Sequence, residues 1–381
     1  MLCTVSTVKD SRANIEQLVQ RNLASGADHM FIFLEINADD TYGFLIDHPC
    51  VTPVLTDDAY WRDSRPDELT SRQLVNANLV NCLLSPLESV GWLVHLDGDE
   101  CLDIDKERLF GLDAAIRCVR LAVLEAVSSD QPAAHPSLDV QYFKKKLKRE
   151  QLERLTELGA IAAPHNRHYF FGYLIGKAAV RPGLDLNMGI HRASWKNGQG
   201  IEHLKAEPFN VLHYDSVSSD EFVRKWEAHL SGGATKFRPE RQVVAVAIAA
   251  VLNEQSLDEA AKKRRLTEIY TRHIEDPVDL LLELGLLVRP PTDRHEYEPT
   301  PFTDRDAKAV DGLLRRLLAV DKAMFHPESG PDSSLAVMRE VRRGFGRFHR
   351  ATATRIDAAI ERAVSELRRH DHPAPTPSPG R

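Results

Sequence analysis

Apolar and polar residues alternate in blocks over the first hundred positions of the chain. Short apolar runs at 2–8, 29–36 and 51–55 are rich in β-branched and aromatic residues, which is typical of buried strands. Between them, apolar residues recur at helical spacing over 15–23 and over 71–84. Strands that alternate with helices in this way predict a largely parallel sheet with right-handed crossovers.

The stretch from 91 to 102 joins a strand to an acidic cluster. Its apolar first half predicts a buried strand, which runs straight into Asp97, Asp99 and Glu100. Carboxylates this close repel one another unless a cation lies among them. Mg²⁺ and Mn²⁺ prefer oxygen ligands and accept phosphate oxygens, and ligands of open α/β sheets bind at the carboxyl ends of the strands. The pattern predicts either a site for a metal-bound diphosphate or a solvated acidic turn.

The rest of the chain changes character twice. Residues 118–127 suit a strand or a short helix equally well, and later short strands lead into His191 and His213. From 238 onward the apolar spacing is helical, and the chain ends in a proline-rich stretch that is typical of disorder. We therefore expect an α/β fold in which a Rossmann-like, mostly parallel sheet is flanked by helices and followed by a helical C-terminal region. The expected units are a nucleotide-binding catalytic domain at 1–232, the helical region at 233–368 and a disordered tail at 369–381.

Charge and cysteine content narrow the function classes. The formal net charge of −7 argues against broad nucleic-acid binding. Five dispersed cysteines predict reduced thiols in the cytoplasm, and the longest smooth apolar run, 243–252, is too short for a transmembrane segment. No signal peptide is visible at the start of the chain. The basic run at 144–149 suits either a solvated helix face or a contact with phosphates or acidic lipids, which leaves peripheral membrane contact open.

Several segments match one known family. Leu96 to Glu100 reads Leu-Asp-Gly-Asp-Glu, Thr7 to Asp10 looks like an opening strand and turn, and 26–32 looks like the start of the second strand. Later matching segments are Arg72-Gln73 with Asn76 and Asn78, 177–182, 189–192, 212–214, and Phe222 with Lys225-Trp226. Over roughly residues 3–230 the chain thus resembles the GT-A type glycosyltransferases, and within them the bacterial glycosyl transferase family 2-like branch that carries a Leu-Asp-x-Asp-Glu motif.

The resemblance implies a reaction and a set of roles. The reaction is transfer of a sugar from a nucleoside-diphosphate sugar to a hydroxyl of a saccharide or glycan acceptor, as in a hexosyltransferase, with inversion favoured over retention. The cofactor implied is Mn²⁺ or Mg²⁺, held by Asp97 and Asp99 with His191 or His213 as a late ligand. The implied nucleotide-sugar pocket contains Lys9, Asp10, Asp39, Arg72 and Asp97. Only Asp39 or Asp40 remains of the acidic motif that the family has after its second strand, so the nucleotide base is not predicted.

Two further expectations follow from chemistry. An inverting transfer needs a general base, normally a carboxylate. Glu207 and Asp215 are the carboxylates closest in sequence to the two histidines, and we favour Asp215. Because strand ends on one edge of a sheet converge, one of the two histidines is expected beside Asp99. We favour His191, because the small Gly189 lies two residues before it.

Two other function classes remain open. A nucleotidyltransferase also uses paired aspartates with Mg²⁺, but residues 7–13 contain no glycine for a phosphate-binding loop. A catalytically degenerate, transferase-like scaffold is favoured by the altered motif after the second strand. Metal-dependent binding of a nucleoside diphosphate separates an enzyme from such a scaffold.

Overall fold

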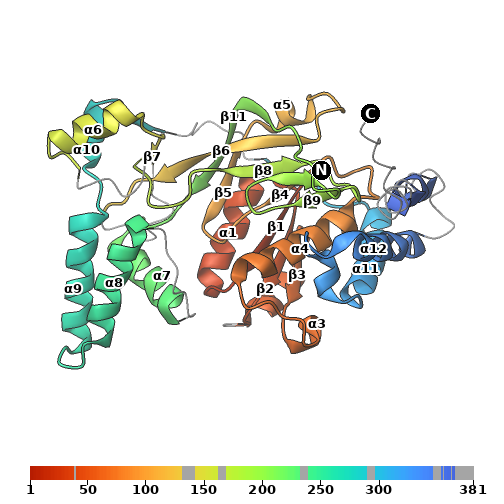
Figure 1. Cartoon of the computed structure of the whole chain (residues 1–381), viewed down its shortest axis with the longest axis horizontal. Coiled ribbons are helices and arrows are strands. Elements are labelled where there is room, and N and C mark those ends of the chain that lie inside the picture. The colour runs from red at the N-terminus through yellow and green to blue at the C-terminus, as the bar shows by residue number, and fades with distance from the viewer. Residues whose placement is uncertain are drawn as a thin grey trace, which may run out of the picture.

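A large curled sheet, flanked by helices, forms the centre of the molecule in the computed structural model (Figure 1). The structure describes residues 1–37, 40–130, 142–161, 169–231, 239–289, 297–345, 353–354, 356–361 and 363–364. Most strands of the sheet run in the same direction, so the predicted α/β class is confirmed, and the arrangement is consistent with a Rossmann-like nucleotide-binding fold. The predicted tail at 369–381 lies outside the described residues.

The N-terminal half of the sheet is parallel. Its order is β3 (Val51–Leu55), β2 (His29–Leu34), β1 (Leu2–Val8) and β4 (Trp92–His95). Every residue of β1, β2 and β4 is buried, because helices cover both faces of a parallel sheet. The helices of this half are α1 (Arg12–Ala24), α2 (Thr41–Ile46), α3 (Asp58–Trp61) and α4 (Leu69–Leu84).

The other half mixes directions. Strand β8 (Lys177–Val180) lies antiparallel between β4 and β6 (Cys118–Ala126), and the segment left open as strand or helix is therefore a strand. The long β11 (Leu204–His213) runs parallel to β6 and antiparallel to β5 (Glu100–Ile104). Short β7 (Phe143–Lys144) and β12 (Leu287–Val288) continue the sheet beyond β6.

The predicted buried strand at the start of the stretch 91–102 is β4, and the residues after the acidic turn form a further strand, β5, that the pattern did not predict. The chain leaves β4 after His95, turns through 97–99 and returns as β5 on a different partner, β11. A turn of Asp97, Gly98 and Asp99 separates the two strands, since these residues favour turns over strand interiors. The acidic cluster therefore lies in a reversal of the chain.

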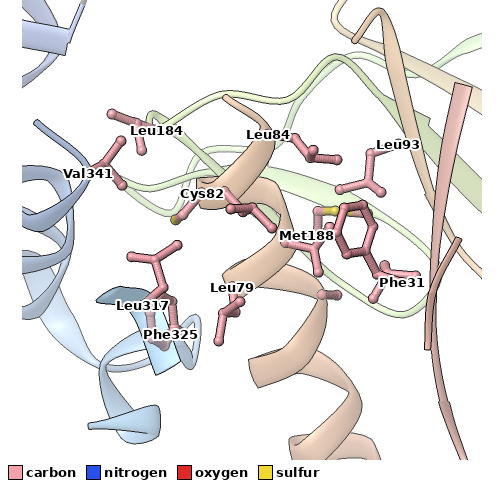
Figure 2. Close-up of a cluster of buried hydrophobic side chains, with 14 of the residues drawn as sticks. Phe31, Leu79, Cys82, Leu84, Leu93, Leu184, Met188, Leu317, Phe325 and Val341 are labelled. Carbon is pink, nitrogen blue, oxygen red and sulfur yellow. The ribbon is translucent and has the colours of Figure 1, made fainter. Parts of the chain in front are cut away.

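The C-terminal helices pack onto the first half of the sheet. One continuous apolar cluster joins α4, β2 and β4 to Leu317 of α11 (Asp304–Leu318), Phe325 of η2 (Lys322–Phe325) and Val341 of α12 (Gly330–Gly344) (Figure 2). Helix α12 ends at Gly344, a residue type that favours helix termination, and the described residues 353–354, 356–361 and 363–364 are helical again.

A second group of helices lies at the opposite end of the sheet (Figure 1). Helices α7 (Ser219–Ser231), α8 (Pro239–Asn253) and α9 (Glu259–His273) enclose their own apolar cluster around Phe222, Trp226 and Tyr270. The remaining elements are α5 (Lys106–Phe110), α6 (Arg149–Glu157), α10 (Val278–Glu283) and a small hairpin of β9 (Leu186–Met188) and β10 (Ala193–Trp195). Among the described residues, no helix has the length and apolar content to cross a bilayer. All five cysteines are buried thiols outside any disulfide.

Candidate functional site

Strand register brings the polar residues of the site together. Strand β11 lies between β5 and β6, and its last residue, His213, is paired with Glu100 on one side and Glu125 on the other. The backbone N–H of Tyr214 donates to the Asp99 carbonyl at 2.9 Å, which fixes the acidic turn against the end of β11. The ends of β4, β6 and β11 thus meet at one edge of the sheet, the place where ligands of α/β sheets bind.

Three side chains of metal-ligand type converge there. The Nε2 atom of His213 lies 3.5 Å from Asp99 Oδ2 and 3.9 Å from Asp215 Oδ1. The three potential ligand atoms of Asp99, His213 and Asp215 all lie within 4.8 Å of one another. His213 and Asp215 are buried, whereas the Asp99 side chain is 31% exposed and faces solvent. We call these three residues the acidic triad.

Lys225 of α7 bridges the acidic triad. Its Nζ atom lies 2.6 Å from Asp99 Oδ2 and 2.5 Å from Asp215 Oδ1, and Arg241 lies 3.5 Å from the other oxygen of Asp215. Burial by itself raises the pKa of each carboxyl group, but Lys225 outweighs burial and holds the pKa of both Asp99 and Asp215 well below the usual range. Both are therefore carboxylates at neutral pH.

Asp97 and Glu100 form a second group around Lys177. The buried Lys177 ammonium lies 2.6 Å from Asp97 Oδ2 and 3.1 Å from Glu100 Oε2, and Gln73 donates to the other Asp97 oxygen at 2.7 Å. Burial would raise the pKa of Asp97, but Lys177 lowers it to about 2. For Glu100 burial prevails and raises the pKa to about 7, and its carboxylate accepts from the Tyr173 hydroxyl and the Asp97 backbone N–H.

The two histidines have different surroundings. Burial would lower the pKa of His213, but Asp99 and Glu125 raise it to about 10. Its Nδ1 atom faces Glu125 Oε2 at 3.7 Å, and Glu125 is held by the backbone N–H groups of Phe171 and Gly172. His191 lies in the β9–β10 turn, where its Nδ1–H donates to the Gly176 carbonyl at 2.9 Å. The histidine against Asp99 is therefore His213, although the sequence favoured His191.

The other residues expected in the nucleotide pocket differ in their exposure and in their ion-pair partners. Lys9 is exposed at the end of β1, and Asp10 pairs with Arg224 of α7 at 2.9 Å. Arg72 is paired with Glu35 and donates to the Pro66 and Asp67 carbonyls, so it braces a loop. Asp39 and the side chain of Glu207 lie outside the described residues.

Sequence reasoning did not assign four side chains that complete the site. Lys225 and Lys177 act as its internal cations, Glu125 faces the inner side of His213, and Tyr173 lies between the two histidine rings at 4.6 and 5.0 Å between ring centroids. Lys177 and Lys225 were visible as parts of matching segments. Their pairing with particular carboxylates depends on long-range packing and leaves no local signal.

The chemistry of the acidic triad fits a divalent ion. Two carboxylates are donors that both Mn²⁺ and Mg²⁺ accept, and His213 would become a nitrogen donor for Mn²⁺ on losing the proton that its raised pKa retains at neutral pH. The arrangement of Glu125 behind His213 resembles the carboxylate–histidine pairs that orient metal-binding imidazoles. An ion on Asp99 and Asp215 would need the same oxygens that now contact Lys225.

Gly172 leaves room for the His213 ring. A β-carbon added at Gly172 would lie 2.2 Å from His213 Cε1 and 2.8 Å from Glu125 Oε2, which is far inside van der Waals contact. Gly172→Ala is expected to push the imidazole off Asp99 and to weaken Mn²⁺ binding about 10-fold, as measured by calorimetric titration. Gly200→Ala is the matched control, since a β-carbon there meets nothing within 4 Å. Equal Mn²⁺ affinity for Gly172→Ala and the unmodified chain would contradict this role.

Comparison with known proteins gives little information about the family or the function of this chain. No family model matches the sequence, and no curated protein matches it. Among solved structures, a Bacillus anthracis protein described as a glucose-1-phosphate thymidylyltransferase, in complex with sucrose, aligns with a TM-score of 0.27 and 6% sequence identity over 48% of this chain and 73% of that chain. A TM-score this low carries no information about the function of this chain.

Proposed function

We propose that the chain is a GT-A type glycosyltransferase that moves a sugar from a nucleoside-diphosphate sugar to a hydroxyl of a saccharide or glycan acceptor. The observation that carries the proposal is the convergence of Asp99, His213 and Asp215 at the carboxyl-end edge of a Rossmann-like sheet. This edge is where such sheets bind nucleotides. The Leu-Asp-Gly-Asp-Glu segment that forms it is also the segment with the most specific resemblance to the family.

The residues divide into three tasks under this proposal. Asp99, His213 and Asp215 would hold Mn²⁺ or Mg²⁺, which when bound neutralises the charge of the leaving diphosphate. Asp97, whose carboxylate is fixed by Lys177 and Gln73, would accept hydrogen bonds from the donor ribose or sugar. Arg224, which is 44% exposed and pairs with Asp10, would supply positive charge for phosphate oxygens.

The charges around Asp215 favour a role in the cation site over the role of general base. A base works best when its pKa lies near the operating pH, and the pKa of Asp215 is held far below that range by Lys225 and Arg241. Glu100 meets the pKa requirement at about 7, and it accepts a hydrogen bond from the hydroxyl of Tyr173, whose ring packs against both histidines. We therefore propose that Asp215 binds and orients the cation instead of taking a proton.

The test is a panel of nucleoside-diphosphate sugars with different bases and sugars. Each is incubated with the protein in Mn²⁺, in Mg²⁺ and in chelator, and released nucleoside diphosphate and melting temperature are measured. A true donor should raise the free energy of unfolding by about 2.7 kcal/mol when present at 100 times its Kd. Release of nucleoside diphosphate supports glycosyl transfer, whereas formation of pyrophosphate from a sugar phosphate and a nucleoside triphosphate indicates a nucleotidyltransferase. Neither product and no thermal shift would reject both enzymes.

A further inference from the structure

Lys225 lies where a divalent ion would have to bind. Its ammonium contacts one oxygen of Asp99 and one of Asp215, at 2.6 and 2.5 Å, and both residues belong to the acidic triad. An ion that coordinates these oxygens at about 2.1 Å excludes the ammonium from the same position. The sequence pattern predicts a cation among the carboxylates, and in the described part of the chain the Lys225 ammonium is such a cation.

Of the two lysines in the site, Lys177 and Lys225, only Lys225 is placed so that its ammonium can move away from its carboxylate partners. Lys177 has no exposed side-chain surface and is fixed by Asp97, Glu100 and the Tyr173 ring. Lys225 is 20% exposed and extends from α7 on a flexible four-carbon stem toward the exposed Asp99. A lysine ammonium is a mobile point charge with three donors, so it can exchange one set of anionic oxygens for another.

We propose that Lys225 is a displaceable internal cation, which closes the acidic triad in the free protein and yields Asp99 and Asp215 to a divalent ion. Once released, the ammonium needs new anionic partners, and the diphosphate of the donor provides phosphate oxygens at the same edge of the sheet. Binding of the ion and binding of the donor then favour each other. The ion frees the Lys225 ammonium for the diphosphate, and the diphosphate supplies the anionic partners that the displaced ammonium lacks. The inference rests on the proposed function for the identity of the anionic ligand, but not for the exchange itself.

The exchange is tested by Mn²⁺ binding without nucleotide. Lys225→Met removes the competing charge and nearly keeps the side-chain length, so we expect Mn²⁺ to bind at least about 10-fold more tightly in calorimetric titration or by electron paramagnetic resonance. Lys225→Arg keeps a cation there and should stay close to the unmodified protein. Lys263→Met is the matched control, because it removes one positive charge from a side chain that is 66% exposed and pairs with Asp220, and it should change the Mn²⁺ affinity by less than about threefold.

The second measurement follows the released ammonium. At saturating Mn²⁺, Lys225→Met should bind a nucleoside diphosphate about 10-fold more weakly than the unmodified chain, since one phosphate contact is lost. Lys225→Gln replaces Lys225→Met if melting curves show that the methionine variant does not fold. Equal or weaker Mn²⁺ binding in the folded variant overturns the proposal.

The two proposals fail in different ways. Tighter Mn²⁺ binding in Lys225→Met, in a protein for which no nucleoside-diphosphate sugar acts as donor, supports the exchange and rejects the proposed function. Donor turnover in the unmodified protein, together with Mn²⁺ affinity that is unchanged by Lys225→Met, rejects the exchange and keeps the proposed function.

Discussion

Asp99→Asn is expected to lower kcat/KM for sugar transfer by about 100- to 1,000-fold, the range found when one group that stabilises developing negative charge is removed. Asp99 is the exposed member of the acidic triad and the residue that both His213 and Lys225 contact. Its replacement by asparagine keeps the shape of the side chain and removes its charge. The cation site then loses its solvent-facing carboxylate, and with it the means to hold positive charge beside the leaving diphosphate.

The measurement is steady-state release of nucleoside diphosphate from the donor that the panel identifies, with Mn²⁺ varied from zero to saturation. Asp220→Asn is the matched control, because Asp220 is also acidic and lies on α7, but its side chain is 72% exposed and pairs with Lys263. The control should keep the unmodified kcat/KM. Near-normal turnover of Asp99→Asn in chelator would show that Asp99 and a cation bound to it have no part in catalysis.

The first half of the fold could be predicted from the sequence because its strands are buried on both faces. The run 2–8 contains four apolar residues, small hydroxyl side chains and no charge, which suits a strand covered on both faces, and the structure puts all seven of its residues in the interior. The pattern could not show that 91–102 is two strands. The break depends on β5 pairing with β11, which lies about a hundred residues later in the chain.

The acidic half of the site could also be seen in advance, because Asp97 and Asp99 are close in sequence. His213 was among the candidates, but its position against Asp99 comes from the register of β11 between β5 and β6. For Lys144 the sequence pattern indicated the wrong environment. In a run of basic residues it suggested a solvated or phosphate-binding surface, yet its side chain is buried between two carboxylates.

Lys144→Met is expected to lower the free energy of unfolding by about 3–5 kcal/mol, the usual cost of removing one partner from a buried ion pair. Lys144 lies 3.2 Å from Glu125 and 3.0 Å from Asp276, and all three side chains are at most 2% exposed. Both carboxylates also accept further hydrogen bonds, Asp276 from the Tyr169 hydroxyl and Glu125 from the Phe171 backbone N–H. Methionine fills much of the same volume, so the loss is chiefly that of the charge.

The loss is measured by denaturant unfolding at neutral pH, and the adjacent Lys145→Met is the control, because that side chain is exposed and its replacement should cost less than about 0.5 kcal/mol. A triple variant, Lys144→Met with Glu125→Gln and Asp276→Asn, removes all three charges together. It should recover part of the lost stability, since no unpaired charge then remains in this cluster. If Lys144→Met were as stable as Lys145→Met, the two carboxylates could not depend on Lys144 as their counter-ion. The support behind His213 would then have to come from the backbone N–H groups that hold Glu125.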